Sequence, residues 1–209
     1  MDEIHFMSLN LPADVADSLK QALALLPDGD QAKVSQQKET DGAFNHIAFV
    51  TTPKNRYVFR ARRQASLEET TEYMRYMYEF SGFLKLGGGF RIRSTQEEIE
   101  FLKQALEADL PVPELIHYGQ DWMLIEYIQG QTLWSLLEQG QVEPLLRVLH
   151  VLNQANSRGI IYADRWGGNE MIDPHGNVRL IDFDIEWING QNSPDTLKSL
   201  EMAWCLFNA

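Results

Sequence analysis

The chain has 209 residues, of which 44% are hydrophobic and 11% aromatic. This length and composition suffice for a real hydrophobic core in one compact body, with room for two lobes. The formal net charge is −12 at pH 7. Because an acidic surface repels the backbones of nucleic acids and the headgroups of anionic lipids, the charge argues against nucleic acid as a partner.

The cysteine content and the hydropathy pattern predict where the protein resides. The single cysteine, Cys205, excludes an internal disulfide and is typical of a reducing compartment. The N-terminal residues lack the basic segment and apolar run of a secretory signal. No apolar stretch approaches the ~20 residues that cross a bilayer. The sequence therefore predicts a cytoplasmic protein without an integral membrane segment.

The first half of the chain predicts a helix, a linker, a hairpin and a second helix. Apolar residues recur at helical spacing over 12–26, and the polar stretch 29–41 predicts a linker. Residues 42–62 predict two strands joined by a turn at 52–55. Residues 66–84 predict another helix. Its tyrosines and methionines indicate either packing between helices or a contact between copies in a homo-oligomer.

Ser94 opens the next predicted helix, which stops before Pro111. Ser94 with Glu97, and Thr95 with Glu98, both have the spacing of a capping box. In a capping box the hydroxyl accepts a hydrogen bond from the backbone N–H three residues later, and the carboxylate accepts one from the backbone N–H of the capping residue. The two pairs therefore place the beginning of this helix at residues 94–95.

The second half of the chain is mostly helical. Two strands joined at 119–120 are followed by a short helix over 132–140 and a longer one over 143–157. A hairpin comes next, and Ser193 with the following proline suits the start of a last helix. Strands with an intervening helix, followed by a mostly helical half, predict an α+β fold of two lobes.

The most informative stretch runs from Tyr162 to Asp184 and reads YADRWGGNEMIDPHGNVRLIDFD. Asp164 is followed five positions later by Asn169, and the predicted hairpin then leads to Asp182. Transfer of a phosphoryl group from a nucleotide needs a carboxylate beside the attacking hydroxyl and oxygen ligands for magnesium. Each residue alone is commonly an ordinary loop or turn residue. The three together, around a hairpin, favour a phosphotransfer site.

Several segments resemble protein-kinase-like enzymes of the atypical type. YADRWGGN resembles their His-Gly-Asp or His-Ala-Asp loop, and LIDFD resembles their Asp-Phe-Gly element. Two features resemble Kdo kinases, which phosphorylate lipopolysaccharide sugars. One is the aspartate in the third position of the Asp-Phe-Gly element, Asp184, and the other is the strand YVFRARR. EEIEFLKQALEADLPVPELI resembles a segment of RIO-like, Kdo and aminoglycoside kinases, and MLIEYIQGQTL resembles their hinge. The resemblance covers residues 42–187.

This resemblance implies roles for the loop and hairpin residues. Asp164 is expected to be the catalytic base that orients the acceptor hydroxyl. Asn169 and Asp182 are expected to hold Mg²⁺. The implied fold is a minimal two-lobed protein-kinase-like fold with a truncated helical C-lobe. Residues 1–41 would form an N-terminal helix and linker, 42–126 the N-lobe, and 127–209 the C-lobe.

The resemblance also implies a nucleotide site. Arg60 takes the place of the strand lysine that contacts the phosphates of ATP, with Glu98 as its partner. Arg62 and Glu100 are the next choices, because a shift of two residues keeps the face of a strand unchanged. The adenine pocket is expected to include Glu126, Tyr127 and Ile128.

The implied activity is that of a kinase that uses ATP and Mg²⁺ to phosphorylate a hydroxyl of an unidentified acceptor. The acceptor would be a small molecule or the protein's own side chains. An arginine at position 60 and the lack of a glycine-rich loop before that strand leave an alternative open. In that alternative the protein is a pseudokinase, a nucleotide-binding or regulatory interaction module.

Overall fold

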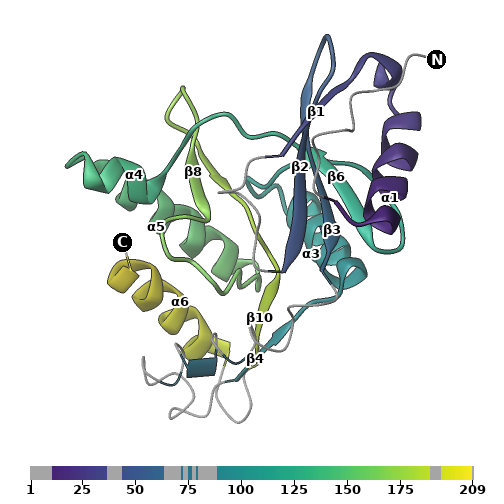
Figure 1. Ribbon diagram of the computed structural model, residues 1–209. Helices are drawn as coiled ribbons and strands as arrows, with labels where there is room; N and C mark the ends of the chain where they lie inside the picture. Colours follow the sequence, from purple (N-terminus) through teal and green to yellow (C-terminus); the bar gives the residue numbers. More distant parts are fainter. Residues whose placement is uncertain are drawn as a thin grey trace. The chain divides into compact units, whose positions relative to one another are not determined.

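The computed structural model contains helices and antiparallel sheets, which confirms the α+β class (Figure 1). The chain divides into two compact units, the first formed by residues 1–70, 94–99 and 114–127 and the second by 71–93, 100–113 and 128–209. The structure describes residues 11–36, 44–63, 72, 75–76, 79, 89–188 and 194–208.

The first unit contains a five-stranded sheet. Its strands are β1 (Lys33–Ser35), β2 (Asn45–Thr51), β3 (Arg56–Arg62), β5 (Leu115–Tyr118) and β6 (Trp122–Glu126). The order is β1-β2-β3-β6-β5, and every neighbouring pair is antiparallel. The β2–β3 hairpin predicted from the sequence is present, and the Asn55 N–H donates to Thr52 Oγ1 across its turn at 3.0 Å.

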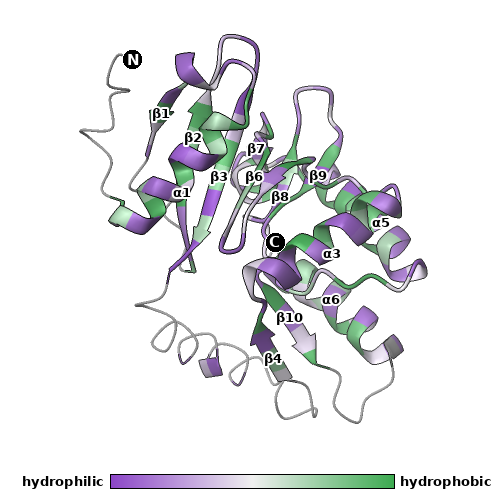
Figure 2. Ribbon diagram, turned by 90° about the vertical axis from the view of Figure 1, so that its right-hand side faces the viewer, coloured by the Kyte–Doolittle hydropathy of each residue, from purple (hydrophilic) through white to green (hydrophobic). Residues whose placement is uncertain are grey.

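Helix α1 (Ala13–Ala24) covers one face of this sheet, because its apolar residues recur on one side. Leu19 is fully buried there and belongs to the same cluster as Phe59 and Trp122 of the sheet. The rings of Phe59 and Trp122 stack with centroids 5.9 Å apart. Figure 2 shows α1 lying over β2 and β3, and the helix itself carries both hydrophobic (green) and hydrophilic (purple) residues. This packing supplies the core of the first unit.

The first half of the chain differs from the sequence prediction at residues 29–35. The stretch predicted as a linker contains a 3₁₀ turn, η1 (Gly29–Gln31), and strand β1 within its described part. The linker prediction is therefore wrong at these residues, because β1 pairs with β2 at the edge of the sheet. Such pairing depends on a distant partner that a polar stretch does not reveal. The helix expected over 66–84 lies largely outside the described residues.

Helix α3 (Thr95–Glu107) begins with the capping box expected at Ser94. The Ser94 N–H donates to Glu97 Oε2 at 2.8 Å, and the Glu97 N–H donates to Ser94 Oγ at 3.3 Å. The second pair expected there, Thr95 with Glu98, has another arrangement, because the Glu98 carboxylate contacts Arg60 instead. Ser94 and Glu97 thus cap the beginning of α3, and Glu98 pairs with an arginine of strand β3 instead.

Within its described residues, the second unit contains small antiparallel sheets and further helices beside the remainder of α3. One sheet pairs β4 (Gly89–Ile92) with β10 (Ile185–Ile188). The other has the order β7 (Gln131–Thr132), β8 (Glu170–Ile172) and β9 (Val178–Leu180). The helices are α4 (Leu133–Glu138), α5 (Glu143–Ser157) and α6 (Pro194–Asn208). The hairpin expected after residue 169 is β8–β9.

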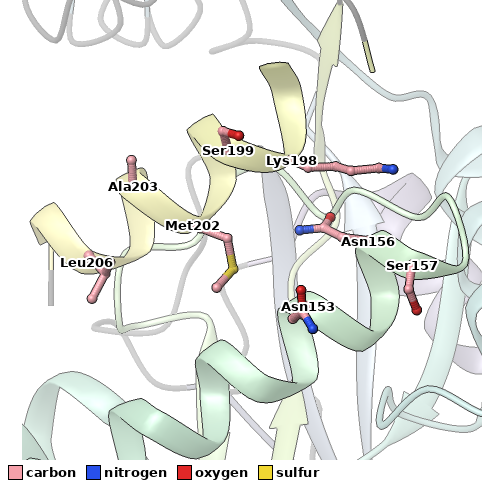
Figure 3. Close-up of a pocket in the computed structure, with 8 residues that line it drawn as sticks. All are labelled: Asn153, Asn156, Ser157, Lys198, Ser199, Met202, Ala203 and Leu206. Atoms are coloured by element: carbon pink, nitrogen blue, oxygen red, sulfur yellow. The ribbon is translucent and has the colours of Figure 1, made fainter. Parts of the chain in front are cut away.

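Helices α5 and α6 lie side by side and leave a surface groove of about 580 Å³ between them (Figure 3). Asn153 and Asn156 of α5 and Lys198 and Met202 of α6 line it. Cys205 of α6 is fully buried, and burial raises the pKa of its thiol to about 12. Of the helices in the described part of the chain, none has the length and hydropathy that a bilayer crossing requires.

Candidate functional site

The loop that carries Asp164 runs from the end of α5 to the start of β8. Its backbone folds back sharply at Ala163, which has a φ of 70°. The loop is closed by Asn169, whose Nδ2 donates to the backbone oxygen of Asp164 at 2.9 Å. Asp164 is half-buried and Asn169 is buried. The five-residue spacing read from the sequence therefore brings the asparagine amide back to the aspartate.

Arg165 ties this loop to the residue that follows β9. Its side chain is fully buried. The guanidinium donates to the backbone oxygen of Asn169 at 3.2 Å, of Ile181 at 3.0 Å and of Asp182 at 2.5 Å. In addition, the Ile181 N–H donates to the Asn169 oxygen at 2.9 Å. Asn169 and Asp182 are thus held next to each other by their backbones.

The charge of Arg165 is balanced by Glu170, the first residue of β8. The two side chains are fully buried, and Arg165 Nη1 lies 3.4 Å from Glu170 Oε1. The other carboxylate oxygen accepts a hydrogen bond from the Gly167 N–H at 2.6 Å. Burial raises the pKa of the Glu170 carboxyl, although Arg165 and the Gly167 N–H oppose the effect. The pair thus joins the loop to the first residue of β8.

The side chains of Asn169 and Asp182 offer oxygen atoms of the kind that Mg²⁺ takes as ligands. The amide nitrogen of Asn169 is engaged by Asp164, so its amide oxygen is the group oriented for another partner. Asp182 adds a half-buried carboxylate and has a φ of 62°, which is strained for a residue other than glycine. An amide oxygen and a carboxylate oxygen are ligands that Mg²⁺ prefers. The residues present therefore fit the expected ion.

Glu201 of α6, which the sequence analysis did not single out, anchors the beginning of the loop. It is fully buried, and its Oε1 accepts hydrogen bonds from the N–H groups of Tyr162, at 2.5 Å, and Ala163, at 2.8 Å. With its amide nitrogen toward Glu201, Asn156 donates to Oε2 at 3.0 Å and to the Ile160 oxygen at 3.2 Å.

The environment of Glu201 favours its neutral form. Burial raises the pKa of its carboxyl to about 7, and the hydrogen bonds from the Ala163 and Tyr162 N–H groups together with Arg165 oppose the effect. The sequence did contain a signal for this residue. Glu201 follows Leu197 by four residues and precedes Cys205 by four, so an acid stands on the buried face of the helix.

Aromatic packing supports the segment after β9. Phe183 lies 5.5 Å from the ring of Tyr162 and 5.4 Å from that of Phe101, and these two rings lie 5.7 Å apart. Arg93 places its guanidinium 4.2 Å from the Phe101 ring and donates to the backbone oxygens of Phe183 and Ile185. Burial also raises the pKa of the Tyr162 hydroxyl. Tyr162 thus serves as a packing residue.

The charged residues expected to contact nucleotide phosphates lie in the first unit. Arg60 Nη1 is 2.8 Å from Glu98 Oε1, and both side chains are buried. Arg62 Nη2 is 3.5 Å from the other oxygen of the same carboxylate. Glu100, the second choice as a partner, instead forms an exposed pair with Lys103 at 2.8 Å. Both arginines on this face of β3 therefore share Glu98.

The residues expected to line an adenine pocket lie where the chain leaves β6. The Glu126 N–H donates to the Glu114 oxygen at 2.9 Å, and its carboxylate accepts from the Glu114 N–H at 3.2 Å. The Tyr127 ring has the Arg56 guanidinium 3.9 Å from its centroid. Ile128 is buried and belongs to the second unit. The residue-by-residue roles expected from the resemblance remain proposals.

Comparison with known proteins gives limited similarity. No protein-family model matches the chain. A segment of the chain is 32% identical over 77 residues to serine/threonine-protein kinase 10 of Homo sapiens. The chain shares a partial similarity with a protein kinase. The match spans 33% of this chain and 8% of the human protein, so the similarity indicates a kinase-like relationship without assigning a type of kinase.

Proposed function

We propose that this protein is an atypical kinase that transfers the γ-phosphate of ATP to a hydroxyl of an acceptor, with Mg²⁺. The observation that carries the proposal is the buried guanidinium of Arg165. It binds the backbone oxygens of Asn169 and Asp182, while Asn169 binds that of Asp164. These contacts link the three residues to which we assign the base and the magnesium donors, and this supports the proposal.

In the proposed reaction, the acceptor hydroxyl oxygen attacks the γ-phosphorus and the bond from that phosphorus to the β–γ bridging oxygen breaks. The hydroxyl proton passes to the carboxylate of Asp164, and ADP is the leaving group. Magnesium, when bound, neutralises charge on the phosphate oxygens, and Asn169 and Asp182 would hold it. Arg60, fixed by Glu98, is proposed to contact the nucleotide phosphates. Tyr127 and its two neighbours are proposed to contact the adenine.

The test is ADP formation from ATP in the presence of Mg²⁺. We expect Asp164→Ala to lower turnover by roughly 10²–10⁴-fold, the usual contribution of a positioned base. Asp182→Asn is expected to lower turnover and to raise the Mg²⁺ concentration needed for half-maximal turnover. Asp195→Ala serves as a control, because that carboxylate is 87% exposed at the surface of α6. Turnover in Asp164→Ala equal to that of the unchanged protein would refute the proposal.

A nucleotide-binding regulator without turnover is the second candidate function. It is favoured by Arg60, because a planar and permanently charged guanidinium replaces the lysine of the related enzymes. Unfolding monitored with ATP, with and without Mg²⁺, separates the two candidates. ATP at a concentration 100 times its dissociation constant stabilises the folded protein by roughly 2.7 kcal/mol. Stabilisation without ADP formation would favour the regulator, and ADP formation would favour the kinase.

A further inference from the structure

Two tryptophans in the second unit are exposed and contact each other. Trp166 belongs to the loop that carries Asp164 and is 39% exposed, while Trp134 belongs to α4 and is 44% exposed. Their ring centroids are 5.4 Å apart, with an angle of 79° between the planes. Large aromatic side chains gain most from burial. An exposed pair of indoles therefore offers surface that a ligand can cover.

The backbone is shaped to hold this pair in place. The Trp134 N–H donates to the oxygen of Gly167 at 2.9 Å, and Gly167 has a φ of 91°, which favours glycine. At Gly168, an added Cβ would lie 2.3 Å from the Trp166 ring. The two glycines therefore allow the Trp166 indole to lie directly on the loop backbone. The pair is a fixed surface of two indoles, which we call the indole platform.

The indole platform lies close to the proposed catalytic carboxylate. Trp166 follows Asp164 by two residues, so their Cα atoms are at most about 7.6 Å apart. Arg165 and Asn169 of the same loop are buried, whereas Asp164 is half-buried and Trp166 is exposed. Asp164 and Trp166 are thus loop side chains that are at least partly open to solvent.

We propose that the indole platform, Trp134 with Trp166, binds the ring of an acceptor whose hydroxyl is directed to Asp164. The inference rests on the proposed phosphotransfer and specifies its class of substrate, a small alcohol that carries a ring with a flat apolar face. Indoles carry no charge, and their faces pack best against flat C–H or aromatic surfaces. A pyranose and an aromatic alcohol both present such a surface, so both are tested.

The experiment measures binding of simple alcohols by titration calorimetry at millimolar concentration. Methyl glucopyranoside represents the carbohydrate class and benzyl alcohol the aromatic class, while sorbitol is an open-chain control with several hydroxyls. We expect one of the two ring compounds to bind and sorbitol not to bind. Trp166→Ala is expected to weaken that binding roughly tenfold, the effect of losing one stacked ring. Trp166→Phe is expected to restore part of the affinity.

A control variant and a second readout make the outcomes distinct. Phe207→Ala removes an aromatic ring that is 81% exposed near the end of α6, and it should leave the affinity unchanged. Binding of neither ring compound, equal binding of sorbitol, or an unchanged affinity in Trp166→Ala would each overturn the indole platform.

ADP formation with the bound compound separates this inference from the phosphotransfer proposal. Turnover that depends on Asp164, without ring binding that depends on Trp166, would refute the platform and leave the kinase proposal standing. Ring binding that depends on Trp166, without any turnover, would refute the kinase proposal and leave the binding site standing. In the expected result, the ring compound that binds also raises the rate of ADP formation, and Trp166→Ala raises its KM.

Discussion

Replacing Glu201 by glutamine removes a buried titratable group without a large change of shape. The glutamine side chain keeps an oxygen that can accept from the N–H groups of Tyr162 and Ala163, as the carboxylate does. The amide of Asn156 can turn to present either its oxygen or its nitrogen to the second atom of the group. Glu201→Gln therefore isolates the effect of the charge that the carboxyl gains on ionisation.

The size and sign of this effect follow from the pKa of Glu201. Burial raises the pKa from its usual 4.5 to about 7 in the folded protein, so the folded state binds the proton more tightly than the unfolded state. The stabilisation from Glu201 is then complete below pH 4.5 and is lost as the pH rises through 7. At 1.36 kcal/mol for each pH unit, the loss amounts to about 3 kcal/mol.

The assay is urea unfolding of the unchanged protein and of Glu201→Gln from about pH 4.5 to about pH 8. We expect the free energy of unfolding of the variant to rise by about 3 kcal/mol relative to the unchanged protein over this range. Glu170 also has a raised pKa, but it titrates in both proteins and its contribution cancels. Glu100→Gln, at an exposed site of α3, is the control. A difference between the two proteins that stays constant with pH would refute this reasoning.

Three further changes should alter the free energy of unfolding measured in urea. Arg165→Met leaves the buried carboxylate of Glu170 without its guanidinium and should destabilise the protein by about 3–5 kcal/mol at neutral pH. An equal loss of unfolding free energy at a pH below the usual pKa of a glutamate would contradict the role of charge. Glu98→Gln breaks a buried ion pair and should cost about 3 kcal/mol, whereas Glu100→Gln, at the surface, should cost about 0.5 kcal/mol or less. Ser94→Ala removes the capping hydroxyl of α3 and should cost about 1 kcal/mol, and an unchanged midpoint would contradict the capping role.

Patterns that are local in the sequence predicted their elements well. The β2–β3 hairpin, the capping box at Ser94 and the long helix α5 all occur as expected. Each depends on residues within a few positions of one another, namely a turn between alternating strands, a hydroxyl three residues before a carboxylate, and apolar residues at helical spacing. Such interactions form from neighbours, so the sequence displays them directly.

Features that depend on distant partners were not predictable in the same way. Strand β1 pairs with β2 across an intervening polar stretch, and β4 pairs with β10, which lies far from it in the chain. The sequence marked Asp164, Asn169 and Asp182 by their spacing. It did not mark Arg165, whose role as a buried connection appears only when the oxygens of three residues meet its guanidinium. An arginine in a loop is usually solvated, so the pattern alone favours a surface position.

The reactivity of the Cys205 thiol can report the local opening of α6. The residue lies one turn beyond Glu201 on α6, it is fully buried, and its pKa of about 12 leaves almost no thiolate at neutral pH. An alkylating reagent can therefore modify the protein only when α6 separates from its neighbours. Because the sequence contains no other cysteine, the rate of modification reports how often the helix that anchors the loop of Asp164 comes away, and no added label is needed.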